Sequence, residues 1–173
     1  MTLTKNDYLK FRRKYEPKHV KLVLIAESPP KNQTYFYNPN GSHKEWLFRA
    51  VMEQLGHAPQ TKEAGLREMQ RRGWVLVDAT YEPVDGLGRQ NKRRDGIILR
   101  DYPLLAATLS ELSPNKSVPI ILIKANVCKL LDDKLTADGF KVINKGVSVP
   151  FPSHGQQPKF HAQFALLLTA TVP

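Results

Sequence analysis

Cysteine is almost absent from this chain, since Cys128 is the only one among 173 residues. A single thiol cannot form an internal disulfide framework, a cysteine-rich zinc site or a four-cysteine iron–sulfur cluster. Histidines with the spacing of a metal site are also missing. We therefore expect a cytoplasmic protein that carries neither a metal ion nor a cofactor.

Long apolar runs are missing as well. The longest ones, residues 119–123 and 164–168, are far shorter than the roughly 20 residues that a membrane span requires. Residues 1–15 are polar and charged and lack the apolar core of a signal peptide. The sequence thus predicts no membrane partner. Its length predicts a single domain over residues 1–173, and a monomer is the favoured state.

The formal net charge of the whole chain is +10, and acidic residues are scarce in three stretches of it. Residues 1–21 hold seven basic and two acidic residues, residues 89–94 hold four basic ones, and residues 141–173 hold three, the last two stretches without any acid. Such a surplus favours a polyanionic partner, either nucleic acid or an anionic membrane surface. A basic surface that is merely solvated is the alternative.

Short apolar runs rich in β-branched residues predict strands at residues 20–26, 74–79 and 118–123, with a weaker one at residues 141–144. Helical patterns lie between and after them, at residues 45–55, 61–72, 101–112, 127–135 and 160–168. Asp101 is expected to cap the third of these helices, with Pro103 in its first turn. This alternation predicts an α/β fold, a three-layer sandwich around a short, mainly parallel four-stranded sheet.

Ligands of such sheets bind beyond the carboxyl ends of the strands. That rule selects the segments that begin at Glu27, Thr80, Lys124 and Pro150. The first and the last of them have the most unusual composition.

The first segment places Glu27 and Ser28 directly after a buried strand, before two prolines. Three consecutive aromatic residues follow in a polar loop, Tyr35, Phe36 and Tyr37. Exposed rings beside a basic surface are what base stacking uses, at about 1–3 kcal/mol per base. The alternative is a loop that packs one ring inward, with Glu27 capping the next turn.

The last segment, residues 146–160, is stiffened by three prolines and presents Ser153, His154, Gln156 and Gln157. Small donors and amides on a rigid loop suit contacts to phosphates and to a groove of DNA. The adjacent Ser153 and His154 do not indicate a serine hydrolase, because neighbouring residues rarely point at each other and no G-x-S-x-G motif is present.

Arg89, Lys92, Arg93 and Arg94 follow the second strand in a stretch that we expect to be a loop. Contacts from such a loop to phosphates would make binding strongly dependent on salt. A solvated loop without a partner is the alternative.

The order of these features resembles the uracil-DNA glycosylase superfamily over residues 20–168. The resemblance rests on a strand running into Glu27-Ser28-Pro29, an aromatic loop, a second strand ending in Asp78, and a late loop with Pro152-Ser153. It implies a parallel four-stranded sheet flanked by helices, and a pocket at the strand ends that receives a damaged base flipped out of DNA.

Matched position by position, residues 26–30 correspond to the first motif of the superfamily, G-Q-D-P-Y or G-E-A-P-G in different branches. Glu27 agrees with the second version, and Ser28 falls where some branches have a water-activating Asp and others an Ala. Phe36 is our choice for the ring that stacks on the base. Asp78 falls where many members use an Asn to read the uracil edge, and residues 151–153 match the late H-P-S motif.

Three departures from these motifs bear on activity. Phe151 replaces the His that would stabilise the departing base, so His154 is the candidate for that role. An ionised Asp78 offers no donor to uracil O4, and it would have to be protonated or the base would differ. Ser28 can position a water but cannot deprotonate it, which leaves Glu27 as the more plausible base.

The sequence therefore predicts a DNA-binding protein of this fold, a candidate DNA N-glycosylase of base-excision repair that hydrolyses the bond to a flipped damaged base. Glu27, Ser28 and His154 are the candidate catalytic residues. Two alternatives remain, a nucleic-acid-binding module without catalysis, and a pocket for a small nucleotide or another phosphorylated ligand.

Overall fold

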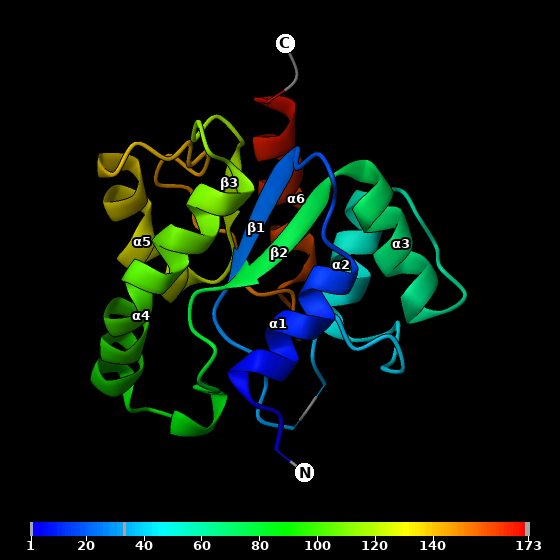
Figure 1. Ribbon diagram of the computed structural model, residues 1–173, viewed down its shortest axis with the longest axis horizontal. Helices are drawn as coiled ribbons and strands as arrows, with labels where there is room; N and C mark the ends of the chain where they lie inside the picture. The colour runs from blue at the N-terminus through cyan, green and yellow to red at the C-terminus, as the bar shows by residue number, and fades with distance from the viewer. Residues whose placement is uncertain (1, 33, 172–173) are drawn as a thin grey trace.

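A computed structural model describes residues 2–32 and 34–171, in which helices pack around a small sheet (Figure 1). The elements in chain order are α1 (Lys5–Lys14), β1 (Leu22–Ala26), α2 (Trp46–Gln54), α3 (Lys62–Arg72), β2 (Trp74–Asp78), the 3-10 turn η1 (Asp85–Leu87), α4 (Asn91–Leu112), β3 (Ile120–Leu122), α5 (Ala125–Ala137) and α6 (Gln157–Thr169).

The sheet has the strand order β2-β1-β3, and both pairs are parallel. All five side chains of β1 are buried, because helices cover both faces of the sheet. Helices α4 and α5 lie on one side of it, and α2, α3 and α6 lie on the other, where α1 joins them (Figure 1). The predicted α/β class and the parallel sheet are confirmed.

The prediction of four strands is wrong, because the described residues form three. Residues 141–144 make a single bridge, between Val142 and Ile120. Beyond it the side chain of Asn144 takes the place of a strand backbone, since its Oδ1 accepts from Leu122 N at 2.7 Å and its Nδ2 donates to Leu122 O at 3.1 Å. The buried amide thus satisfies the edge of β3 and ends the pairing.

The start of α4 was also predicted wrongly. The helix begins at Asn91, ten residues before Asp101, and Pro103 lies inside it. Ile98 is buried in one cluster with side chains of the sheet, so tertiary packing extends the helix across a proline that propensity alone would place near its start. Asp101 is no cap, and it accepts a hydrogen bond from Thr80 Oγ1 at 2.6 Å.

Helix α1 was not predicted, although its first turn carries a clear signal. Thr4 and Asp7 form a capping box, in which each side chain bonds to the backbone of the other. The helix buries Tyr8 and Arg12. By contrast, the predicted end of α3 is confirmed, because Gly73 closes it with a left-handed φ of 79°.

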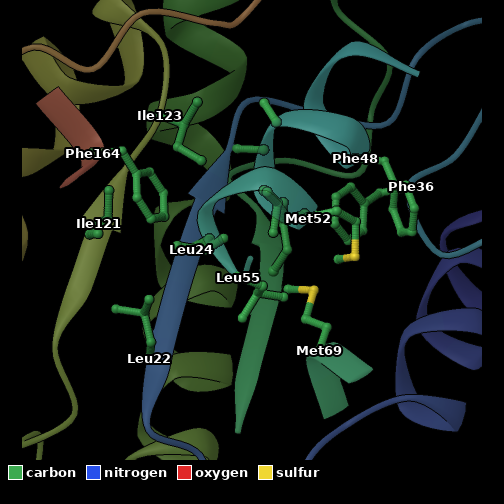
Figure 2. Packing of buried hydrophobic residues seen from close by; sticks show 14 of the residues in the cluster. Leu22, Leu24, Phe36, Phe48, Met52, Leu55, Met69, Ile121, Ile123 and Phe164 are labelled. Atoms are coloured by element: carbon green, nitrogen blue, oxygen red, sulfur yellow. The ribbon is translucent and has the colours of Figure 1, made fainter. Parts of the chain in front are cut away.

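A cluster of aliphatic, aromatic and sulfur-containing side chains fills the space between the sheet and α2, α3 and α6 (Figure 2). Gly65 of α3 lies against this cluster, and a Cβ placed there would come within 2.6 Å of the Phe48 ring and 2.9 Å of Met52 Sδ. The two helices therefore need a glycine at this point to approach each other.

We expect Gly65→Ala to destabilise the protein by about 1–3 kcal/mol, since overpacking outweighs the better helix propensity of alanine. Gly96→Ala in α4 is the matched control, because a Cβ there meets no atom within 4 Å. It should stabilise the protein by about 1 kcal/mol. Urea unfolding of both variants tests this, and equal effects of the two changes would contradict it.

Within residues 2–32 and 34–171, no helix is long and apolar enough to cross a membrane.

Candidate functional site

A cavity of about 480 Å³ opens at the edge of the sheet where β1 and β2 end. Ligand sites of parallel sheets are expected at this edge. The cavity brings together six of the predicted site residues, from four separate segments: Glu27, Ser28, Tyr35, Phe36, Asp78 and Ser153.

Glu27 is the first residue after β1, and only 7% of it is exposed. Both of its carboxylate oxygens are engaged, because Lys124 Nζ donates to Oε1 and Asn126 Nδ2 donates to Oε2. The Arg94 guanidinium adds a second positive charge, with Nε 3.7 Å from Oε2. Glu27 thereby holds the Lys124 ammonium at the wall of the cavity.

Lys124 joins β3 to α5 in a backbone conformation that side chains rarely adopt, with φ +88°. Its N–H donates to Val149 O at 2.7 Å, and its C=O accepts from Cys128 N at 3.0 Å. Such strain costs about 1–3 kcal/mol and persists only where the surroundings enforce it. The fold thus stores strain at the residue that brings a positive charge into the cavity.

Ser28 and the loop after it are tied to the turn that follows β2. Ser28 Oγ accepts from Val84 N at 3.3 Å, and Lys31 N donates to both carboxylate oxygens of Asp85 at 3.1 Å. Both Ser28 and Asp85 line the cavity. These bonds orient the Ser28 hydroxyl, and because no acceptor among the described residues takes its proton, the hydroxyl can donate to a bound water or ligand.

Asp78 ends β2, and its side chain lies on the same face of the sheet as Leu76, because side chains alternate along a strand. It is 5% exposed, and among the described residues its Oδ2 has no hydrogen-bond partner. Burial raises the pKa of this carboxyl to about 7, and the charge of Arg12 and the Tyr35 hydroxyl oppose the shift only in part. Near neutral pH, Asp78 is thus present in both protonation states.

The three aromatic residues are buried, so the prediction that they form an exposed stacking loop is wrong. Phe36 packs against Phe48 with 5.4 Å between the ring centroids (Figure 2), and Tyr35 packs edge-on against Tyr8 at 4.8 Å. Both still line the cavity. The Tyr37 hydroxyl bonds to the N–H and C=O of Leu76, which makes it a structural link between loop and sheet.

The late loop contributes Phe151 and Ser153 to the cavity wall. His154 is exposed, and its ring lies edge-on to Trp46, with centroids 5.6 Å apart. His154 does not line the cavity, whereas Trp46 does. Gln156 and Gln157 stand at the start of α6, outside the cavity.

The predicted basic loop is the beginning of a helix. Lys92, Arg93 and Arg94 occupy the first turn of α4, and Arg89 lies in the turn before it. Positive charges are unfavourable at a helix N-terminus, where the dipole attracts anions. Arg94 meets Glu27 and Asp95 there, and this contact places the basic segment beside the cavity.

A second cavity, of about 470 Å³, lies between α1 and α4 on the other side of Asp78. Its charged walls largely neutralise one another, since Arg100 bonds to both Asp101 and Glu82. Within the part of the chain that the structure describes, no group of three His, Cys, Asp or Glu side chains is arranged to hold a metal ion.

The sequence analysis missed Lys124, Asn126 and Trp46 as site residues. Lys124 and Asn126 follow directly after the third strand, where the strand-end rule pointed, but neither belongs to a motif. Trp46 lies within the helix predicted at residues 45–55 and was assigned no role, although it begins that helix and 44% of it is exposed.

Comparison of the chain with known protein families finds no family model that matches, and comparison with curated proteins finds no match either.

Proposed function

We propose that this protein binds DNA and hydrolyses the N-glycosidic bond of a damaged base that is turned out of the helix into the cavity. The observation that supports it is the meeting of three groups at one strand edge. They are a carboxylate-bound ammonium at Lys124, a buried carboxyl at Asp78 and an aromatic ring at Phe36. The cavity volume falls in the range of about 300–1,000 Å³ that small ligands occupy.

Phe36 and Asp78 would recognise the base. The ring of Phe36 is fixed by its packing against Phe48 and offers a flat apolar surface. A protonated Asp78 has one donor and one acceptor, which together match the N3–H and O4 of uracil. Ionised, it accepts only, and then it suits a base whose edge presents two donors.

Lys124 and Ser28 would assist the cleavage. When the bond between C1′ and the base nitrogen breaks, its electron pair leaves with the base, and the Lys124 ammonium stabilises that negative charge. A water held by the Ser28 hydroxyl supplies the oxygen that bonds to C1′, and the proton it releases ends on the departing base. Glu27 acts by holding Lys124, because both its oxygens are engaged.

The surface around the cavity would bind the DNA backbone. Lys92 and Arg93 are exposed next to Arg94, which contacts Glu27. On the other side, Ser153 and Gln156 present small donors from the late loop. Each phosphate neutralised in this way steepens the decrease of affinity with salt.

The engagement of both Glu27 oxygens favours a second candidate function, DNA binding without hydrolysis. The remaining carboxylates of the cavity wall are Asp78, Asp85 and Glu45, and two of them are already bound, Asp85 to Lys31 N and Glu45 to the amine of Lys62. Binding and cleavage must therefore be measured separately.

The test is incubation of the protein with single strands and duplexes that carry uracil, hypoxanthine or xanthine, followed by alkaline cleavage of abasic sites. We expect cleavage of at least one substrate and a loss of about 100-fold in Lys124→Met, a magnitude typical of removing one charge-stabilising group. Lys129→Met is the control, because Lys129 is exposed on α5, the helix that follows Lys124. It removes one positive charge as well and should leave cleavage unchanged.

Absence of any abasic product, with salt-sensitive DNA binding retained, would leave the binding module as the function. Loss of binding even at about 50 mM salt would refute both.

A further inference from the structure

Trp46 is a large apolar side chain that remains exposed at the mouth of the cavity. It is 44% exposed and lines the cavity, while its ring lies edge-on to His154 of the late loop, with centroids 5.6 Å apart and an interplanar angle of 68°. The protein thus presents a pair of rings outside the buried core, from α2 and from the late loop, and Trp46 lines the same cavity as Phe36 and Asp78.

The base of this ring pair is rigid. Glu45, the residue before Trp46, accepts a hydrogen bond from the buried amine of Lys62, which also donates to Tyr35 O at 2.8 Å. Burial lowers the pKa of Lys62, whereas its bond to Glu45 opposes that change. One buried lysine therefore connects the start of α2 to the aromatic loop that lines the cavity. These bonds fix the backbone at Trp46, although the side chain of Trp46 is itself exposed.

The charges near the ring pair favour an anionic partner. Lys44 and Lys159 are exposed, two residues before Trp46 and five residues after His154, and Lys124 lines the cavity. The segment that carries His154, residues 141–173, contains no acidic residue. Aromatic faces set among cations are the arrangement that binds single-stranded nucleic acid, through base stacking and phosphate attraction.

We propose that Trp46, supported by His154, stacks on an unpaired base of single-stranded DNA next to the base in the cavity. The proposal rests on the proposed function and adds a substrate class, single-stranded DNA. In a duplex the neighbouring base is stacked and paired, so Trp46 could reach its face only if that base were unstacked, at a cost of a few kcal/mol. In a single strand the face is free.

Fluorescence of Trp46 provides a direct test. Trp74, the other tryptophan, begins β2, is partly buried and packs against Phe164, so Trp74→Phe leaves Trp46 as the only indole. In that background we expect a lesion-free oligo(dT) to quench the emission and a duplex of the same length to leave it nearly unchanged. Oligo(U) that quenches more strongly than oligo(dT) would overturn the assignment to DNA.

Variants of Trp46 measure how much stacking contributes to the affinity for single-stranded DNA. Stacking of one base corresponds to about 5- to 150-fold, and we expect Trp46→Ala to weaken oligo(dT) binding within that range while changing duplex binding less than about twofold. Trp46→Phe should restore most of the loss, because it keeps an aromatic face. Equal weakening of single-strand and duplex binding would overturn the proposal.

The two failures are distinguishable. Excision of a base with unchanged Trp46 fluorescence would refute the stacking site and leave the proposed function standing. Quenching by oligo(dT) without excision of any base would support the stacking site and refute the glycosylase.

Discussion

Replacing Asp78 by Asn is expected to stabilise the protein by up to about 4 kcal/mol at pH 8, because an ionised carboxyl is then no longer buried. The difference between the ordinary pKa of 3.8 and the folded value of about 7 corresponds to this free energy at 1.36 kcal/mol per pKa unit. For a chain of this length the melting temperature should rise by about 8–16 °C.

The effect should depend on pH in a definite direction. Between pH 4 and 7 the unfolded chain has lost the Asp78 proton while the folded protein keeps it, so the contribution of Asp78 to the wild-type stability falls as the pH rises and levels off above 7. Asp78→Asn should remove this fall and match the wild type near pH 4. Arg12, Tyr35 and Tyr81 surround the carboxyl, and their unchanged presence in the variant isolates the effect of Asp78.

Asp101→Asn is the matched control with the opposite sign. The bonds from Arg100 and Thr80 lower the pKa of Asp101, so its ionised form stabilises the folded protein above pH 4 and this contribution is lost as the pH falls. The variant should therefore be less stable than wild type at pH 7. A stability of Asp78→Asn that parallels the wild type from pH 4 to 8 would contradict the burial argument.

The same change tests base recognition under the proposed function. At pH 8 about one tenth of the wild-type Asp78 is protonated, whereas an Asn amide offers a donor and an acceptor at any pH. We expect uracil excision by the wild type to fall above pH 7, and that by Asp78→Asn to stay level and exceed it about tenfold at pH 8.

The sheet and most of the helices follow from patterns that are local in the sequence. The apolar runs of β1, β2 and β3 and the glycine at the end of α3 indicate their own structure. The failures occur where tertiary contacts decide. Asn144 ends a fourth strand through its side chain, and burial of Ile98 carries α4 through the region that propensity assigns to a loop.

The candidate site shows the same division. The strand-end rule and the motifs placed Glu27, Ser28, Asp78 and Ser153, and the structure brings them to one cavity. Exposure of the aromatic loop was inferred from its polar neighbours, but its rings face the core. A side chain's direction in a loop depends on what it meets, which a single sequence does not contain.

The pairing of Glu27 with Lys124 could not be predicted for a related reason. The two residues are 97 positions apart and meet because β1 and β3 are adjacent and parallel. The strand order and the positive φ of Lys124, which the sequence does not mark with a glycine, together determine the contact. The strand-end rule selects the segment that begins at Lys124, but no motif there indicates a chemical role.

Removal of the Lys124 amine should lower both the rate of cleavage and the stability of the protein, and two variants separate these effects. Lys124→Gly and Lys124→Met both delete the charge that Glu27 holds at the cavity, so under the proposed function both should lower cleavage about 100-fold. They differ in the backbone, because glycine adopts φ +88° without strain whereas methionine does not.

Stability separates the two contributions of Lys124. Each variant leaves Glu27 with Asn126 and the more distant Arg94 as partners, which should cost about 1–3 kcal/mol. Lys124→Gly should be about 1 kcal/mol more stable than Lys124→Met, because glycine relieves the backbone strain at position 124. Urea unfolding measures the difference in stability between the two variants. A glycine variant less stable than the methionine variant would show that the backbone at position 124 is unstrained. A glycine variant that cleaves at the wild-type rate would show that the amine has no part in the chemistry, whatever its stability.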